Sequence, residues 1–237
     1  MMATNKARSP KHFAILALLL AIGPMIASCA HTNELAKYNV RGASVVYRSH
    51  AAGNAQSTTS NTSTSSSGNP AIDLGAAIGN DIAANQAQQK LRKAIIPDSL
   101  AAALAVGIQK AVSDYLQMKA VSGDNSTFIV ETILERYEIS SSSTSISAQV
   151  QGTSRIIDRR SGKIVWEDGE SETIPLRNST AAALTSAVSD MVAGAINAQE
   201  LANMSEAEMH TVLGNAAKEV GREIGEVLRK DVAKMTK

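Results

Sequence analysis

The beginning of the chain restricts its fold more than any other feature, because it has the make-up of a segment that is removed. Lys6, Arg8 and Lys11 precede an apolar run at residues 13–22, and Gly23 and Pro24 then interrupt any helix. A helix needs about 20 apolar residues to cross a bilayer, so this run is too short to remain as a span. Basic, apolar and helix-breaking residues in this order are typical of an export signal. We therefore expect residues 1–28 to be cut off.

The signal ends in the sequence Ile26-Ala27-Ser28-Cys29, which resembles the lipobox of bacterial lipoproteins. The resemblance implies cleavage between Ser28 and Cys29, transfer of acyl chains such as palmitate to the Cys29 thiol, and a membrane anchor through those chains. Cys29 is the only cysteine, so it has no partner for a disulfide within the chain. The alternative interpretation is a chance thiol in an ordinary signal or membrane segment.

The residue after Cys29 is Ala30 and not aspartate. In enteric-type bacteria, an aspartate at that place retains lipoproteins at the inner membrane. The resemblance therefore implies an anchor in the outer membrane, with the folded domain facing the periplasm.

Composition and charge exclude one class of partner. Removal of Lys6, Arg8 and Lys11 takes the formal net charge from +1 to −2. A chain with this balance has no general electrostatic attraction to nucleic acid, so we expect no such partner. Hydrophobic residues make up 44% of the chain and aromatic residues 3%, which predicts a core built mainly from Ala, Val, Ile and Leu.

The part that begins at Cys29 divides into three segments. Residues 29–48 contain the acylated N-terminus and a first strand at residues 38–48, where valines and tyrosines stand near alternating positions. Residues 49–69 are rich in Ser, Thr and Asn and have almost no apolar side chains, so we expect a disordered tract. Such a tract, about 20 residues long, would let the domain reach roughly 25 Å from its anchor. Residues 70–237 form the periplasmic α/β domain.

Hydrophobic periodicity predicts the elements of this domain. Apolar residues spaced three and four apart indicate helices at residues 70–96 and 98–121. Alternating residues indicate strands at residues 128–139 and 145–158 and a strand that starts at Ile164, after a tight turn at residues 158–163. This strand is expected to decay in the acidic run that follows it.

The C-terminal third is expected to be helical. One helix covers residues 180–201, and another begins at a capping box formed by Ser205 and Glu208. The second helix has an apolar stripe that should lie on the sheet: Leu213, Ala217, Val220, Ile224, Val227 and Leu228. Its basic end (Arg229, Lys230, Lys234 and Lys237) could meet a membrane surface, but the preference of helix C-termini for cations is a simpler explanation.

These elements predict an α/β fold of the α+β type. It is a two-layer sandwich of a small, mainly antiparallel sheet with helices on one face, in the order β-α-α-β-β-β-α-α. The helices and the sheet each have one apolar side, and stacking them buries both sides in a single core.

The sequence contains no recognisable catalytic or metal-binding pattern. His12 is removed with the signal, His31 and His50 stand in polar segments, and His210 has no second ligand at metal spacing. The acidic run Glu167–Glu172 lacks the loop spacing of a calcium site, and we interpret it as a solvated strand edge that repels other strands. We expect no enzyme activity, no cofactor and no metal.

The predicted hairpin contains Asp158, then Ser161-Gly162-Lys163, and then Trp166. This pattern resembles a hairpin found in several periplasmic lipoprotein families. They include auxiliary lipoproteins of ABC-type transporters, the lipopolysaccharide-assembly lipoprotein, and the curli-secretion and penicillin-binding-protein-activator lipoproteins. The resemblance covers about residues 98–176, and it implies the fold and the location but no functional residues.

The sequence predicts a non-catalytic, lipid-anchored cell-envelope protein that acts in assembly or interaction at the outer membrane, with a protein partner in the envelope. The alternative is a lipid- or small-molecule-binding auxiliary subunit of an envelope transport machine. A wide apolar groove between the helices and the sheet would favour this alternative, whereas a flat exposed apolar patch on the helices would favour the first function.

Overall fold

The structure is a computed structural model of the chain. It describes residues 31–53, 55, 57–58, 61–62, 70–123, 125–142, 145–178 and 190–235. The chain divides into two compact units, Met1–Ala30 and His31–Lys237, and every described residue belongs to the second unit. The predicted signal, its cleavage site at Ser28 and the acylation site at Cys29 therefore lie outside the described residues.

A mixed sheet forms the centre of the second unit, with its strands in the order β1-β8-β7-β6-β2-β5. Four of these strands are long: β2 (Ser44–Ala51), β6 (Phe128–Ser142), β7 (Ser145–Asp158) and β8 (Lys163–Asn178). β6, β7 and β8 form an antiparallel meander, while β2 runs parallel to β6. The short strands β1 (Thr32–Asn33) and β5 (Lys119–Ala120) pair at the two edges.

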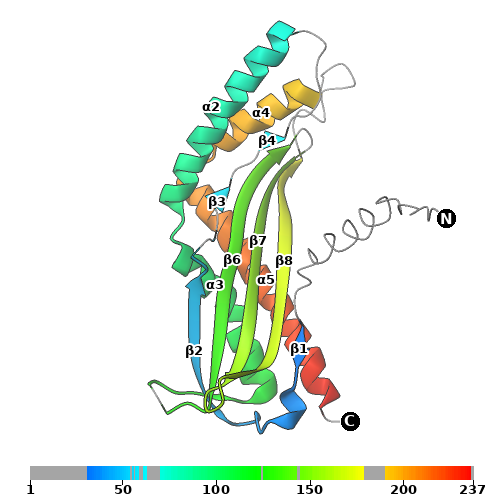
Figure 1. Cartoon of the computed structure of the whole chain (residues 1–237). Coiled ribbons are helices and arrows are strands. Elements are labelled where there is room, and N and C mark those ends of the chain that lie inside the picture. Colours follow the sequence, from blue (N-terminus) through cyan, green and yellow to red (C-terminus); the bar gives the residue numbers. More distant parts are fainter. Residues whose placement is uncertain are drawn as a thin grey trace, which may run out of the picture. The chain divides into compact units, whose positions relative to one another are not determined.

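Two helices cover one face of this sheet, α3 (Pro97–Ala111) and α5 (Glu206–Lys234), as Figure 1 shows. Two more, α2 (Pro70–Ala94) and α4 (Asp190–Asn203), lie side by side near the end of the sheet where β6 and β7 are joined. The predicted two-layer α+β fold is confirmed. The order of its long elements is also confirmed, with short strands added before and between them.

The core lies between the sheet and the helices. Along β7, Ile146, Ala148, Val150 and Ile156 alternate toward the helices and are buried, as their spacing predicts. The stripe of α5 lies against them, and Leu213, Val220 and Ile224 are completely buried. Ser205 and Glu208 form the predicted capping box at the start of α5. On the open face of the sheet, Arg155 bridges Glu131 and Glu167.

Helices α3 and α5 cross with their backbones in contact. A Cβ atom added to Gly221 would overlap the carbonyl oxygen of Leu104, and one added to Gly107 would overlap the backbone of Gly221. Gly225 is nearly as close, since its Cβ would lie 3.1 Å from the carbonyl oxygen of Gly107. Only glycine permits so close an approach of two helix backbones.

The N-terminal part of the sheet differs from the prediction. The first long strand begins at Ser44 and not at residue 38, because residues 35–37 form a 3-10 helix (η2) and Gly42 takes a turn conformation with φ +69°. The strand continues to Ala51, and two short strands, β3 (Ser57–Thr58) and β4 (Asn61–Thr62), also pair with β6. Backbone hydrogen bonds to β6 thus order parts of the tract that was expected to be disordered.

The position of this tract in the chain also excludes the spacer role that was predicted for it. β1 and β2 both come before it in the chain and already belong to the sheet. Residues 52–69 therefore connect two parts of the fold, and they cannot act as a spacer between Cys29 and the domain.

Two element ends were also misplaced. The helix expected at residues 98–121 continues from α3 as a π-helical turn, η3 (Val112–Leu116), and ends at Gln117, which has a left-handed φ of 53°. β8 does not decay in the acidic run but continues through it to Asn178, because it pairs with β7 along its whole length. Of the helix expected at residues 180–201, the described part is α4.

Candidate functional site

The folded domain begins almost immediately after Cys29. His31 is the first described residue, and the chain then enters β1, where Thr32 pairs with Glu167 and Asn33 with Trp166 of β8. The amide of Glu34 extends this pairing by donating to the carbonyl oxygen of Val165, at 2.8 Å. The segment next to the predicted acylation site is thus an edge strand of the sheet.

His31 joins this segment to both layers of the fold. Its Nδ1 lies 3.2 Å from Oδ1 of Asp168 on β8, and its Nε2 lies 3.1 Å from Oδ2 of Asp231 on α5. An imidazole carries an N–H on both nitrogens only in its protonated form, and that form donates to both carboxylates at once. We call His31, Asp168 and Asp231, together with Trp166, the N-terminal clasp.

Asp231 is the member of the clasp whose carboxylate is stabilised most fully by its neighbours. Its side chain is 1% exposed. It accepts hydrogen bonds from Nε1 of Trp166, at 3.0 Å, and from Nζ of Lys234, at 2.8 Å. Burial by itself would raise the pKa of Asp231, but the hydrogen bonds from Lys234 and Trp166 and the nearby His31 outweigh it and lower the pKa. Asp231 is therefore held as a carboxylate.

The carboxylate of Asp168 is stabilised less than that of Asp231. Burial and the neighbouring charge of Asp231 raise its pKa, although His31 works in the opposite direction. Its Oδ2 atom is buried and has no hydrogen-bond partner among the described residues. The interpretation of residues 167–172 as a solvated edge is therefore wrong for Asp168, which faces the helices because β8 continues as a regular strand.

Sequence patterns gave no reason to single out His31. It stands in a polar segment, 137 residues before Asp168, and no local spacing connects the two. One usable signal existed further along the chain. Trp166 and Asp168 are two residues apart, so a strand that continues past Trp166 places both on its helix-facing side.

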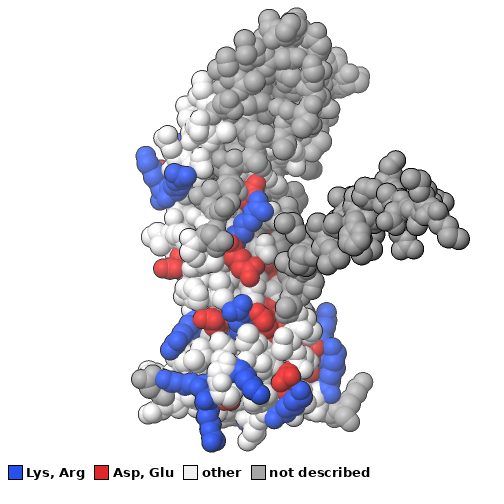
Figure 2. All heavy atoms as spheres, viewed as in Figure 1, with Lys and Arg blue, Asp and Glu red and all other residues white. Residues whose placement is uncertain are grey.

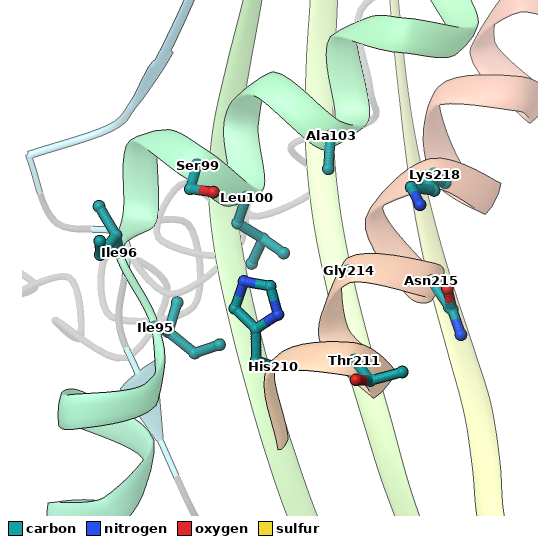
Figure 3. A pocket seen from close by; sticks show the side chains of 10 residues that line it. All are labelled: Ile95, Ile96, Ser99, Leu100, Ala103, His210, Thr211, Gly214, Asn215 and Lys218. Carbon is teal, nitrogen blue, oxygen red and sulfur yellow. The ribbon is translucent and has the colours of Figure 1, made fainter. Parts of the chain in front are cut away.

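A groove lies on the helical side of the molecule, between the α2–α3 corner and α5, and has a volume of about 250 Å³. One wall is mostly apolar, formed by Ile95, Ile96, Leu100 and Ala103, and the other is polar, with His210, Thr211, Asn215 and Lys218 of α5. Figure 3 shows the His210 ring projecting from α5 toward the α3 side. His210 is exposed.

This groove is not the one that the alternative function requires. It separates helices and does not lie between the helices and the sheet. A hollow of about 180 Å³ does lie between those layers, lined by Ile146 and Leu176 of the sheet and by Met204 and Val212 among others. Both are smaller than the usual pocket for a drug-sized ligand, about 300–1,000 Å³.

The described residues contain no group of three or more His, Cys, Asp or Glu side chains arranged to hold a metal ion. Within the same part of the chain, no single helix is long and apolar enough to cross a membrane. One pair bent by 68°, Ile82–Ala94 with Pro97–Leu116, meets the length and composition requirements jointly.

Comparison with known proteins gives distant structural likenesses. No family model and no curated protein matches the chain. A candidate lipoprotein from Caulobacter crescentus is 14% identical, with 56% of this chain and 83% of that one covered and a TM-score of 0.33. Protein XCC0632 from Xanthomonas campestris, of family DUF330, is 13% identical, with 88% and 95% covered and a TM-score of 0.38.

PelC from Paraburkholderia phytofirmans, whose structure is a dodecamer, is 11% identical, with 83% and 97% covered and a TM-score of 0.33. The chain thus has a distant structural resemblance to a candidate lipoprotein, to a DUF330 protein and to PelC. At these scores the likenesses assign no function and no residue.

Proposed function

We propose that the chain is a non-catalytic, lipid-anchored protein of the cell envelope, held in the outer membrane by acyl chains on Cys29 and acting there in assembly or interaction with an envelope protein. The observation that carries this proposal is the position of the fold's first residue. His31 is held by two carboxylates, and it stands two residues after the only cysteine. The chain between Cys29 and this fixed residue is therefore short.

The short connection determines where such a domain would stand. Two extended residues span at most about 7 Å. An acylated Cys29 would therefore hold the β1–β8 edge close to the lipid headgroups, and the domain would not reach into the periplasm on a flexible stalk. Because His31 bonds to both β8 and α5, a pull on the anchor would be transmitted to both layers of the fold.

The hydrogen bonds of the clasp support a holding role. Asp231 uses its oxygens on Trp166, Lys234 and His31, which come from β8, from α5 itself and from the N-terminal segment. Buried polar groups with their hydrogen bonds satisfied in this way rigidify a structure. This fits a fold whose anchor is secured to its interior, and it is the reason for proposing that the site is not catalytic.

The test follows Cys29 in living bacteria supplied with labelled palmitate. The wild type should acquire the label and fractionate with membranes, whereas Cys29→Ser should remain unlabelled and keep its signal. Ser28→Ala is the matched control, since it keeps a small residue at the cleavage site and should be labelled. An unlabelled wild type, or a labelled Cys29→Ser variant, contradicts the proposal.

Two further measurements address sorting and partner. In an enteric host, separation of the two membranes by density should find the wild type in the outer membrane and the Ala30→Asp variant in the inner one. Recovery of the wild type from the inner membrane would contradict the sorting. Crosslinking in intact cells, followed by mass spectrometry, should then identify an envelope protein bound to the domain.

A second candidate function is the binding of a small amphipathic molecule, such as a single acyl chain, in the groove of Figure 3, which has one apolar and one polar wall although it lies between helices. A fluorescent fatty acid is a direct probe. Ala103→Trp should fill the groove and abolish binding. Val106→Trp alters an exposed residue of the same helix outside the groove and should leave binding unchanged. Failure of the wild type to bind would remove this candidate.

A further inference from the structure

We infer that the positively charged end of the sheet binds the anionic phospholipid headgroups of the membrane that holds Cys29. This inference rests on the proposed lipid anchor. It concerns a second contact, which acts through charge and does not require acyl chains.

The strand register gathers cations from distant parts of the chain at one end of the sheet. Ser44 at the start of β2 pairs with Lys119, Val45 pairs with Phe128 at the start of β6, and Asp158 at the end of β7 pairs with Lys163. The loops before β2, around β5 and between β7 and β8 therefore all lie at this end. η2 follows β1 toward the same end.

These segments carry the following exposed cations, which we call the basic end: Lys37, Arg41, Lys119, Arg160 and Lys163. Lys234, near the C-terminus of α5, is also exposed, but its charge is paired with the carboxylate of Asp231. Figure 2 shows Lys and Arg side chains gathered at the lower end of the visible face.

Acidic side chains compensate only part of this charge. Glu34 pairs with Lys37 at 2.9 Å, and Asp158 bonds to the hydroxyl of Ser161. Their carboxylates have lowered pKa values, Glu34 because of its hydrogen bond and charge interaction with Lys37, and Asp158 because of its hydrogen bond from Ser161. No ion pair is found for Arg41, Lys119, Arg160 or Lys163 among the described residues, and all four are exposed. The basic end therefore has a net positive charge.

His31, two residues after Cys29 in the chain, lies closer to this end of β8 than to its other end. His31 stands across from Asp168, and β8 begins five residues earlier at Lys163, about 17 Å away along a strand. A bilayer that receives acyl chains from Cys29 would therefore lie beside the corner where β8 starts. The basic residues at the end of the last helix (Arg229, Lys230, Lys234 and Lys237) are explained by the preference of helix C-termini for cations, without a membrane. The structure adds cations from three other loops along this end of the sheet, from Lys163 at the start of β8 to Lys119 at the opposite edge, and a helix C-terminus does not explain those.

The test separates charge from acylation by using the mature chain, which starts at residue 29, with Cys29→Ser. This protein should float with vesicles that contain 30% phosphatidylglycerol and not with pure phosphatidylcholine, and added salt should release it. Each basic residue near an anionic surface changes binding by roughly fivefold. Lys119→Glu, Arg160→Glu and Lys163→Glu together should therefore lower binding by more than about a hundredfold.

The matched control reverses three exposed cations away from this end: Arg92→Glu, Lys93→Glu and Lys218→Glu. It changes the net charge equally and should retain most of the binding. Circular dichroism and the fluorescence of the single tryptophan check that both triple variants are folded. Equal loss in the two variants, or equal binding of the wild type to both kinds of vesicle, would overturn the inference. Palmitate labelling tests the anchor separately, so either contact could fail alone.

Discussion

The sheet with α3 and α5 and the pair formed by α2 and α4 are built in different ways. In the first region, large side chains such as Trp166, Leu104 and Ile224 are completely buried, and two helix backbones touch at glycine. In the second, the separate buried cluster found among the described side chains of α2 and α4 consists of Ala83, Ala198 and Ala202, while Leu91 and Leu201 belong to the main core. The free energy of burial grows with the apolar area removed from water, so alanines contribute little of it.

This difference indicates that the sheet with α3 and α5 contributes more to the free energy of unfolding than the α2–α4 pair does. Polar contacts also hold the second region together. Nζ of Lys90 donates to the carbonyl oxygens of Ala202 and Met204 at the end of α4. Asn197 donates to the carbonyl oxygen of Ser142 and attaches α4 to the end of β6. We expect the α2–α4 pair to open locally at a lower free energy than the sheet unfolds.

The largest effect should come from Ile224→Asp, in the middle of the α5 stripe. Burying an unpaired carboxylate costs several kcal/mol, which is much of a typical domain stability of about 5–15 kcal/mol. We expect the domain to unfold, with loss of helical circular dichroism and a red shift of Trp166 emission.

Ala198→Asp is the corresponding change in the alanine cluster. It should separate α4 from α2 while Trp166 stays buried, so the emission spectrum should not move. If Ala198→Asp also unfolds the sheet, or if Ile224→Asp stays folded, the two regions do not differ in the way proposed here.

The next largest effect should come from Gly221→Ala. The added methyl group would overlap the carbonyl of Leu104, and separating the two helices should cost about 3 kcal/mol or more. Gly214 lies on the same helix with open space around it, so Gly214→Ala should instead stabilise by about 0.5–1 kcal/mol. Urea unfolding followed by Trp166 fluorescence measures both. Changes of the same sign would show that helix propensity, and not contact, dominates at Gly221.

A smaller effect is expected from Asp231→Asn in the clasp, about 2 kcal/mol of lost stability at pH 7, because the charged hydrogen bond from Lys234 and the bond from Trp166 weaken. The pKa of Asp231 is lowered in the folded protein, so its contribution is present above the unfolded value and is lost as the pH falls through the folded one. Thermal melts between pH 7 and pH 3 should show the wild type losing this increment and Asp231→Asn lacking it.

Asp168→Asn tests a pH dependence of stability that has the opposite sign. The pKa of Asp168 is raised, so the folded protein binds its proton more tightly and stability falls as the pH rises from the unfolded to the folded value. Asp168→Asn should remove that fall and cost less than Asp231→Asn at pH 7. An equal loss in the two variants would mean that the carboxylates contribute alike.

The smallest effect, about 1 kcal/mol, should come from Lys90→Ala, and it should be confined to α2 and α4. Hydrogen exchange should become faster in those helices and remain unchanged in α5. Lys93→Ala removes an exposed cation from the same helix and is the matched control. Faster exchange in α5 as well would show that the two regions unfold together.

Most of the fold could be predicted because local patterns determine it. The alternation in β7 and the turn at Gly162 follow from spacing and from one glycine, and β7 was predicted with its observed ends. The errors arose where pairing with a strand that is distant in the sequence determines the local structure. β8 continues through a polar run because β7 pairs with it, and Ser57–Thr58 is a strand because β6 lies beside it.

The clasp could not be predicted for the same reason. A histidine is informative only together with its neighbours, and those of His31 come from β8 and from the end of the last helix. The crossing of α3 and α5 is a similar case, because the requirement for glycine at residue 221 depends on Leu104 of another helix. The predictions of lipidation at Cys29 and of a non-catalytic role rest on local sequence, and they stay predictions.

If the chain is exported as proposed, the clasp can close only after the last helix has crossed the membrane. A chain that crosses the inner membrane with its N-terminus first would deliver His31 early, while Asp168 follows 137 residues later and α5 emerges last. His31 would then lack both of its carboxylate partners, and β1 its partner strand, until the later parts of the chain arrive. A truncated product could never close this contact, so closure would distinguish complete molecules from incomplete ones, which remain open to periplasmic proteases.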